Sequence, residues 1–260
     1  MNLRQIALTL WALCPSLTPD APASNHRKKI IIDTDLFSDV DDVGSLAIAN
    51  VLHNCHVAGL AGVIINTPSK YGALAASVVN TYFGNPDIPI AAIRPLTEET
   101  FVDTWDFLRG EYASRLAYNW PRSLNDSSTT PTPTSLYRSI LSSSKDHSVT
   151  LISLGILTNL AALLRTPSDS VSPLAGPALI SAKVKELVIM GGQYPSGREF
   201  NFAGIDPEST HHVVNNWPRD VPVTYVGFEL GRDVFSGAAL ATDAPPDSPV
   251  RAAYECYKVP

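Results

Sequence analysis

Five carboxylates lie within ten residues near the start of the chain, at Asp33, Asp35, Asp39, Asp41 and Asp42. Like charges at such close range repel one another, so a folded protein must solvate, protonate or neutralise them. Oxygen ligands in this density are what hard cations such as Ca²⁺ and Mg²⁺ require. The alternative is helix capping and compensation of the helix dipole, which explains one Asp but not five. The segment therefore predicts a metal site.

The elements beside these carboxylates should place them at one edge of a sheet. Residues 30–32 are three isoleucines, typical of a buried strand, and residues 43–50 are typical of the helix that follows. In an open α/β sheet, such a strand-to-helix corner lies at the carboxyl edge, where ligands bind. Asn66, Ser153 and the pair Gly191–Gly192 follow later apolar runs, so we expect them at the same edge. A plain turn is an equal alternative for each.

A second polar pair, Glu199 and Asn201, follows a loop rich in Gly and Pro. Two residues apart on an extended segment, their side chains would point the same way and bind adjacent hydroxyls of one ligand. Solvent exposure is the equal alternative. Asp206-Pro207-Glu208 then predicts a helix start, with Pro at the first helical position.

Apolar runs alternate with helical patterns along the rest of the chain, which predicts parallel strands and one large domain. The sequence thus predicts an α/β fold with an open, mostly parallel, doubly wound (Rossmann-like) sheet. Residues 123–134 are typical of a surface loop, and residues 250–258 begin another helical pattern. We expect strands at 29–33, 58–65, 88–93, 148–153, 185–190 and 221–226, and helices at 42–52, 71–83, 136–143, 157–165 and 207–215.

The net charge and the first residues indicate which partners and which compartment to expect for the protein. A net charge of -6 argues against binding to nucleic acid, which needs a positive surface. Residues 1–23 resemble a signal peptide with cleavage after Ala23, so we expect a secreted protein whose single domain spans 24–260. A buried first helix or a membrane anchor is the alternative, although the apolar run is short for a bilayer. No membrane contact is expected once the signal is removed, and a homo-oligomer stays open.

Several motifs in order resemble the inosine-uridine-preferring nucleoside hydrolase family. The resemblance extends from Lys29 to about Val226 and is specific because the motifs keep their order and spacing. The motifs are Lys29 to Asp35 with Asp41-Asp42, Leu151 to Leu160, Glu186 to Gly192, Glu199 to Asn201, and Asp206 to Glu208.

This resemblance implies a hydrolase that breaks the N-glycosidic bond of small ribonucleosides, giving ribose and free base. It implies a Ca²⁺ cofactor, with Asp35 as metal ligand and general base for the attacking water. Asp33 would support the site from behind. The remaining implied roles are metal binding by Asp42 and the Leu154 carbonyl, and sugar binding by Asp41, Asn66, Glu199 and Asn201.

The chain also departs from the family pattern. Its acidic loop is two residues longer, which leaves open whether Asp39 or Asp41 faces the ribose. The family places a His for the leaving base and a further Asp ligand late in the chain, and nothing after Asp233 matches them. We therefore expect a domain lacking the family's C-terminal part, with impaired activity as one consequence.

Two other functions remain open. A non-catalytic protein that binds nucleosides or ribose would keep the pocket without the late residues. A haloacid-dehalogenase-like phosphatase also has Asp-x-Asp after a strand, with Asp33 as nucleophile and Mg²⁺ beside it. Phe37 and Gly191–Gly192 argue against that class, because its pattern has other residues at these positions.

Overall fold

The computed structural model describes residues 27–36, 39–97 and 112–257. The predicted signal peptide lies outside these residues. Within them, six strands form one sheet in the order β3-β2-β1-β4-β5-β6, and every pair is parallel. The predicted doubly wound sheet is confirmed. The strands are β1 (Lys28–Thr34), β2 (Ala58–Ile65), β3 (Ile90–Ala92), β4 (Val149–Ser153), β5 (Val184–Met190) and β6 (Val223–Val226).

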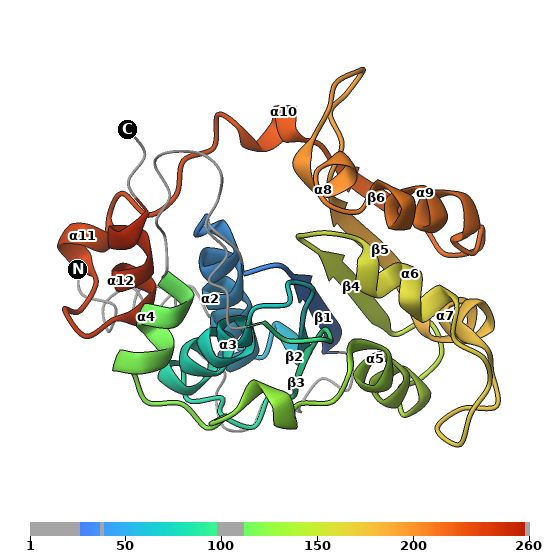
Figure 1. Ribbon diagram of the computed structural model, residues 1–260, viewed down its shortest axis with the longest axis horizontal. Helices are drawn as coiled ribbons and strands as arrows, with labels where there is room; N and C mark the ends of the chain where they lie inside the picture. Colours follow the sequence, from blue (N-terminus) through green and yellow to red (C-terminus); the bar gives the residue numbers. More distant parts are fainter. Residues whose placement is uncertain (1–26, 37–38, 98–111, 258–260) are drawn as a thin grey trace.

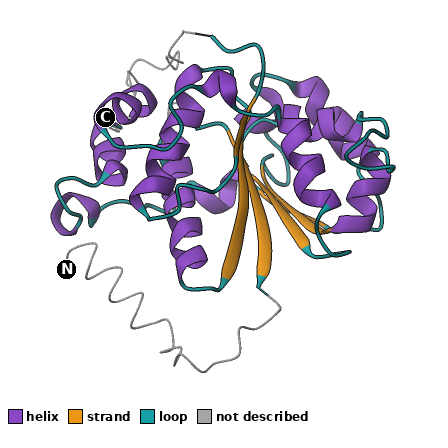
Figure 2. Cartoon of the chain, turned by 90° about the horizontal axis from the view of Figure 1, so that it is seen from below, coloured by secondary structure: helices purple, strands orange, loops and turns teal. Residues whose placement is uncertain are grey.

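Helices flank the sheet on both sides (Figures 1 and 2). None of the described helices has the length and apolar composition needed to cross a membrane. The longer helices are α2 (Asp41–Asn54), α3 (Lys70–Tyr82), α4 (Tyr112–Asn119), α5 (Pro133–Ser142), α6 (Thr158–Leu164), α7 (Gly176–Lys183), α9 (Pro207–Asn216) and α12 (Pro249–Cys256). The short ones are η1 (Ser127–Thr129), α8 (Phe200–Ala203), α10 (Phe228–Gly231) and α11 (Leu240–Asp243).

The isoleucines of β1 explain why the sheet is covered on both faces. Successive side chains of a strand point to opposite faces. Ile30 and Ile32 therefore pack into the core under α2, α3, α4 and α12, while Ile31 packs into the core under α5, α6, α7 and α9. All three side chains are buried, as parallel strands covered by helices on both faces require.

The strand order places a topological switch point between β1 and β4. The connections from β1 through β2 to β3 run in one direction, and those from β4 through β5 to β6 run in the other. In open α/β sheets, ligands bind outside the carboxyl ends of the strands at such a switch point, so the loops after β1 and β4 are where a site is expected.

The chain after β6 crosses the molecule. From α10 it runs over the top of Figure 1 to α11 and then to α12, which lies beside α2, α3 and α4. Residues 228–236 are exposed except for the half-buried Glu229. Helix α12 is anchored by Val250, Ala252 and Ala253, which are buried in the core on that face. Residues of this last segment are thereby brought close to the acidic loop that follows β1.

The predicted strands and helices are all present, with shifted ends. Helix α5 begins at Pro133, inside the segment expected to be a loop, because Thr132 caps it and proline suits its first turn. The same segment also contains η1. Helices α4 and α7 were missed, since neither follows the plain alternation of one strand and one helix.

Candidate active site

The carboxyl ends of three neighbouring strands meet at the switch point. The ladder between β1 and β4 pairs Asp33 with Ser153, and the Leu154 amide then donates to the Asp33 carbonyl at 2.8 Å. On the other side, the backbone amide of Asn66 donates to the Thr34 carbonyl at 3.0 Å. These backbone bonds fix the first residues after each strand. They therefore bring the predicted site residues of β1, β2 and β4 to one edge, as expected.

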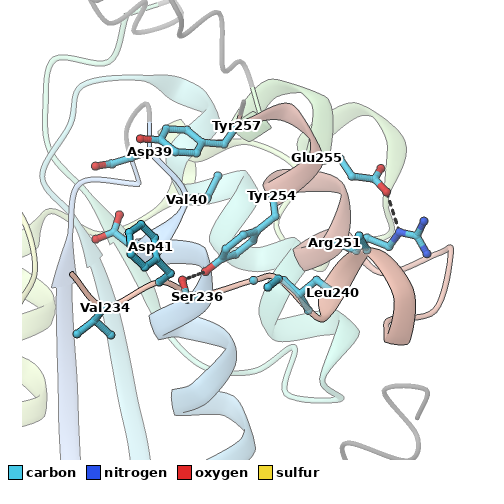
Figure 3. A pocket seen from close by; sticks show the side chains of 14 residues that line it. Asp39, Val40, Asp41, Val234, Ser236, Leu240, Arg251, Tyr254, Glu255 and Tyr257 are labelled. Carbon is cyan, nitrogen blue, oxygen red and sulfur yellow. Dashed lines mark hydrogen bonds and ion pairs between the residues drawn. The ribbon is translucent and has the colours of Figure 1, made fainter. Parts of the chain in front are cut away.

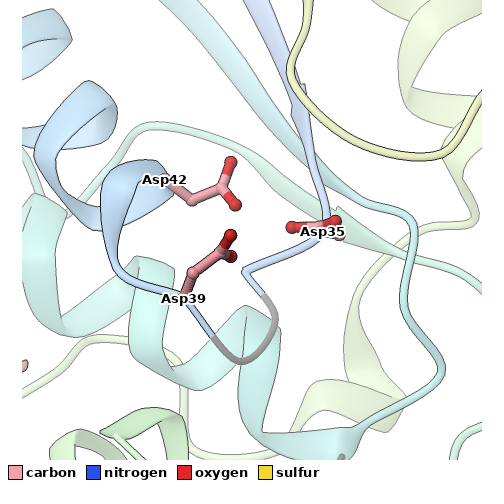
Figure 4. Close-up of side chains that lie close together, drawn as sticks. All are labelled: Asp35, Asp39 and Asp42. Carbon is pink, nitrogen blue, oxygen red and sulfur yellow. The ribbon is translucent and has the colours of Figure 1, made fainter. Parts of the chain in front are cut away.

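Three carboxylates converge beside this edge, at Asp35, Asp39 and Asp42, and we refer to them as the acidic cluster (Figure 4). Their oxygens lie within 4.8 Å of one another. Asp35 and Asp42 are buried and Asp39 is exposed. Asp39 therefore belongs to this cluster with Asp35 and Asp42, and Asp41 lies outside it.

The electrostatics of the cluster fit a cation. Burial raises the pKa of Asp42 well above its ordinary value, and the charges of Asp35 and Asp41 raise it further. The Thr34 hydroxyl donates to Asp42 at 2.5 Å and opposes this rise. Carboxylates that disfavour one another's ionisation are stabilised by a bound positive charge. An all-oxygen set of this kind suits a hard cation such as Ca²⁺.

Asp33, two residues before Asp35, is bound quite differently. Its carboxylate accepts hydrogen bonds from the Tyr137 hydroxyl at 2.7 Å, the Asn66 amide at 2.8 Å and the Asn159 amide at 3.3 Å. Burial still raises the pKa of Asp33 to about 7, although these donors lower it. With both oxygens engaged, Asp33 braces the strand ends and does not face a ligand.

This geometry also argues against the phosphatase alternative. An aspartyl nucleophile must present an oxygen to the phosphorus atom of its substrate. Asp33 is 1% exposed, and its two oxygens are directed at Tyr137, Asn66 and Asn159. Removing these bonds to free a nucleophile would leave the Tyr137 hydroxyl and one N–H each of Asn66 and Asn159 without this acceptor in a buried site.

Gly155 allows the loop after β4 to pass close to the acidic loop. A Cβ atom at this position would lie 2.8 Å from the Asp35 backbone nitrogen and 3.0 Å from Nδ2 of Asn66. Both distances are shorter than normal contacts, so any larger residue would push Asp35 or Asn66 aside. A plain turn was an equal explanation from sequence, whereas the structure ties this glycine to the site.

Asn66 is buried, and its amide nitrogen is fully used. It donates to Asp33 at 2.8 Å and to the Ile156 carbonyl at 2.9 Å. Its Oδ1 atom is buried with no hydrogen-bond partner among the described residues. Asn66 can therefore offer a ligand only an acceptor, which would suit a ribose hydroxyl acting as donor.

The extended conformation expected for Glu199 to Asn201 is wrong. Glu199 is extended, but helix α8 begins at Phe200, because the Glu199 carboxylate caps it. That carboxylate accepts from the backbone amides of Asn201 at 2.7 Å, Gly192 at 2.8 Å and Phe202 at 3.1 Å. The alternative of solvent exposure is also wrong, since both Glu199 and Asn201 are buried. A sugar contact by Glu199 would have to share its carboxylate with these amides.

Asn201 reaches the ends of two strands from α8. Its Nδ2 atom donates to the Leu154 carbonyl at 3.0 Å and to the Met190 carbonyl at 3.2 Å. The Leu154 carbonyl, the predicted backbone ligand, therefore already has one donor and keeps one lone pair for another. Asp206 caps α9, as predicted, and accepts from the Thr158 hydroxyl at 2.9 Å, which ties α9 to α6.

A pocket of about 590 Å³ opens beside the acidic cluster (Figure 3). One wall is residues 39–41 of the acidic loop. The other is formed by residues 234–238, 240 and 241 and by residues 251, 254, 255 and 257 of the chain after β6. Asp41, the predicted sugar ligand, lines this pocket and is exposed. The sequence offered no signal for the far wall, because its Ser236, Tyr254 and Tyr257 belong to no motif.

One family model matches most of the chain. The model of the inosine-uridine preferring nucleoside hydrolases matches residues 30–254. No curated protein sequence matches the chain. Among solved structures, type III effector protein XopQ complexed with adenosine diphosphate ribose is 20% identical, with a TM-score of 0.58 over 86% of this chain. This chain spans 60% of the XopQ chain.

Two further solved structures share the fold. The plant nucleoside hydrolase PpNRh1 is 20% identical, with a TM-score of 0.55, and the alignment covers 88% of this chain and 70% of that one. The purine-preferring ribonucleoside hydrolase from Gardnerella vaginalis is 18% identical, with a TM-score of 0.51, covering 78% and 61%. At these identities the likeness establishes the fold alone.

Proposed function

Since this chain belongs to the inosine-uridine preferring nucleoside hydrolase family, we propose that it hydrolyses the N-glycosidic bond of ribonucleosides, giving ribose and free base. The convergence of Asp35, Asp39 and Asp42 beside a pocket carries the proposal. Breaking this bond develops positive charge on the sugar, and an anionic site stabilises that charge. The acidic cluster supplies it.

We propose Ca²⁺ as the cofactor, held by Asp35, Asp39 and Asp42. The Leu154 carbonyl, through its second lone pair, would complete the set. When bound, such a cation would add positive charge that makes a nearby water easier to deprotonate and orients ribose hydroxyls. Support comes from the donor set itself, which is all oxygen and brings carboxylates within 4.8 Å of one another.

The chain's own residues then divide the work. Asp35 takes the proton from the attacking water, and Gly155 holds Asp35 in place by leaving room for its backbone. Asp33, fixed by Tyr137, Asn66 and Asn159, keeps the end of β1 rigid beneath it. The Asn66 Oδ1 atom and the Asp41 carboxylate accept hydrogen bonds from the ribose hydroxyls. Asn201 positions the Leu154 carbonyl by donating a hydrogen bond to it.

The test is a ribose-release assay on inosine and uridine, with added Ca²⁺ and with a chelator. We expect release of ribose with Ca²⁺ and its loss after chelation. The matched control is Asp87→Asn, which removes an exposed carboxylate before β3, at the opposite edge of the sheet. Absence of ribose release under both conditions contradicts the proposed activity.

Calorimetry separates the enzyme from a non-catalytic binding protein. The internal bonds of Glu199 and Leu154 favour this second candidate, because both groups already have partners within the chain. Heat of binding on titration with inosine or ribose, without any turnover, would establish a nucleoside- or ribose-binding protein instead.

A further inference from the structure

A side chain that the mechanism has not used holds the backbone of the acidic loop. Thr67 follows Asn66 after β2, and it is 1% exposed. Its hydroxyl donates a hydrogen bond to the Asp35 carbonyl at 2.5 Å. We propose that Thr67 is a positioning residue, whose hydroxyl fixes the Asp35 backbone so that the carboxylates of the acidic cluster meet. The inference rests on the proposed hydrolase function.

The pairing of strands stops just before Asp35. The ladder between β1 and β2 ends with Thr34 opposite Ile65, and the ladder between β1 and β4 ends one residue earlier. Asp35 therefore lies one residue beyond the last pair, although its bond with Thr67 is buried. A buried carbonyl needs a hydrogen-bond donor, because leaving it without one costs free energy. The Thr67 hydroxyl supplies a donor from outside the ladders.

The residue after Asp35 has an unusual backbone conformation. Leu36 has a φ of 43°, in the left-handed region that residues with a Cβ rarely adopt. Such a conformation persists only where the surrounding structure enforces it. The Leu36 side chain is buried in the core under α2, α3, α4 and α12, which holds one side of the turn. The Asp35 carbonyl belongs to the peptide group before Leu36, so the Thr67 hydroxyl holds the other side.

The turn at Leu36 sets the direction of the acidic loop. Rotation of the peptide group between Asp35 and Leu36 changes ψ of the first residue and φ of the second. These two angles determine how the chain leaves β1 toward Asp39, whose carboxylate must come within 4.8 Å of the Asp35 carboxylate. By fixing this peptide group, the bond from Thr67 fixes the geometry of the acidic cluster.

Repulsion within the acidic cluster makes this support necessary. Carboxylates at such close range repel one another until a cation binds, so the fold alone must hold them together beforehand. On the β4 side, the loop at Gly155 packs so closely that a Cβ there would lie 2.8 Å from the Asp35 backbone nitrogen. On the β2 side, Thr67 bonds the Asp35 carbonyl. Asp35 is thus held at its amide by packing and at its carbonyl by a hydrogen bond.

The neighbouring Asn66 is held by bonds of its own. Its Nδ2 atom donates to Asp33 at 2.8 Å and to the Ile156 carbonyl at 2.9 Å, and neither bond involves the Thr67 hydroxyl. Removing that hydroxyl should therefore leave Asn66, the proposed acceptor for a ribose hydroxyl, in place. A substitution at Thr67 then separates the positioning of Asp35 from the binding of the sugar.

The experiment compares Thr67→Val, which keeps the shape of the side chain and removes the hydroxyl, with the unaltered protein. Calorimetric titration with Ca²⁺ alone measures the acidic cluster, and we expect the Kd to rise about 5-fold, the effect of one neutral hydrogen bond. Ribose release from inosine at saturating Ca²⁺ measures the reaction. We expect kcat to fall about 10-fold, because a displaced Asp35 is misaligned with the attacking water. KM for inosine should stay within about 3-fold, since Asn66 keeps its bonds.

Three further variants complete the test. Thr67→Ser keeps a hydroxyl that can donate the same bond, and should return Kd and kcat to within about 3-fold of the unaltered protein. Thr129→Val is the matched control, because it removes a threonine hydroxyl that donates to the Asp126 carbonyl at 2.7 Å on the exposed surface of η1, and should change neither quantity. Circular dichroism checks the fold of each variant. If Thr67→Val does not fold, Thr67→Cys takes its place, since a thiol is only a weak donor.

The outcomes are distinct. Weaker Ca²⁺ binding and a lower kcat in Thr67→Val, both restored in Thr67→Ser, support the role of Thr67. Unchanged Kd and kcat overturn the proposal, as does an equal loss in Thr67→Ser, which would trace the effect to packing. If the unaltered protein binds Ca²⁺ but releases no ribose, the proposed hydrolase function fails, and the Kd comparison alone decides the role of Thr67. If it does neither, the inference fails together with the function.

Discussion

Asp33 and Asp35 are separated by one residue, yet their carboxylates lie in opposite surroundings. Asp33 is surrounded by donors, and Tyr137, Asn66 and Asn159 together engage both of its oxygens. Asp35 faces other acids, with carboxylate oxygens of Asp39 and Asp42 within 4.8 Å. Both side chains are buried. Burial alone therefore does not distinguish a structural acid from the acid that we propose as the catalytic base.

The partners make the distinction. A buried carboxylate that receives several hydrogen bonds is satisfied within the protein and contributes to the fold. Carboxylates that face one another raise the cost of ionisation and are stabilised only when something positive arrives. We infer that Asp33 stabilises the strand ends. We also infer that the mutual repulsion of the carboxylates in the acidic cluster is relieved when a cation or a positively charged transition state binds. Four measurements break or sharpen this comparison.

The largest effect should follow Asp35→Asn. The substitution keeps the shape of the side chain but removes the base that accepts the proton of water. We expect ribose release from inosine to fall about 1,000-fold, or about 4 kcal/mol in activation free energy. The free energy of unfolding should not fall, because one of the facing negative charges is gone. Activity retained within 10-fold would remove Asp35 from the role of base.

Asp33→Ala should instead weaken the fold. The alanine would leave the Tyr137 hydroxyl and the two asparagine amides without their acceptor in a buried site. We expect the free energy of unfolding to fall by about 3 kcal/mol, measured by urea denaturation with the unaltered protein as reference. Stability within about 0.5 kcal/mol of the reference would show that these bonds are replaced by water.

The pH dependence of stability should report Asp33 directly. Its pKa is about 7 in the folded protein and about 3.9 in the unfolded chain. Between these values the folded state holds a proton that the unfolded state has lost, so the free energy of unfolding falls as pH rises. The contribution reaches at most about 1.4 kcal/mol per pH unit and ends above pH 7.

The variant Asp33→Asn isolates that contribution. It keeps the shape and cannot ionise, so the slope between about pH 4 and pH 7 should be shallower than in the unaltered protein. Other carboxylates with raised pKa values, such as Asp42, leave a remaining slope of the same sign. Urea denaturation at several pH values measures both proteins, and identical slopes would contradict the assignment.

The smallest effect should come from Asn159→Ala. Its amide makes the longest of the three bonds to Asp33, at 3.3 Å, and the other two donors remain. We expect the free energy of unfolding to fall by about 1 kcal/mol. The kcat for inosine should stay within about 3-fold, since Asn159 contacts no residue of the acidic cluster through this bond. A larger loss of activity than of stability would place Asn159 in the site itself.

Much of the fold could be predicted because its signals are local. Buried parallel strands are continuous apolar runs, as at residues 30–32, and helices between them have their own period. The rule that strand ends meet at one edge then placed Asp35, Asn66 and Leu154 together. Helix α4 and the path of the chain from α10 to α12 escaped prediction, since their positions depend on packing against distant helices and on no regular pattern.

Less of the site could be predicted. The motif assigned Asp41 and Asp42 as a pair at the start of α2, but the backbone of the longer loop turns Asp39 into the acidic cluster. For Glu199, the residue types indicated ligand binding, whereas its carboxylate accepts hydrogen bonds from the backbone amides at the start of α8. In both cases the residue types indicated a polar site, but the direction of each side chain could not be predicted from the sequence.

The sequence by itself determined the sheet, its order of elements and the concentration of acid after β1, because hydrophobic periodicity and the right-handed connection of parallel strands are properties of short segments. Only the tertiary structure decided what each acid does. Asp33 meets Tyr137 from 104 residues away and Asn159 from 126. Ser236 and Tyr254 reach the acidic loop only because the last segment folds back across the sheet. Such contacts join segments whose separation no local pattern records, so the partners of a carboxylate, and with them its role, appear only when the chain is folded.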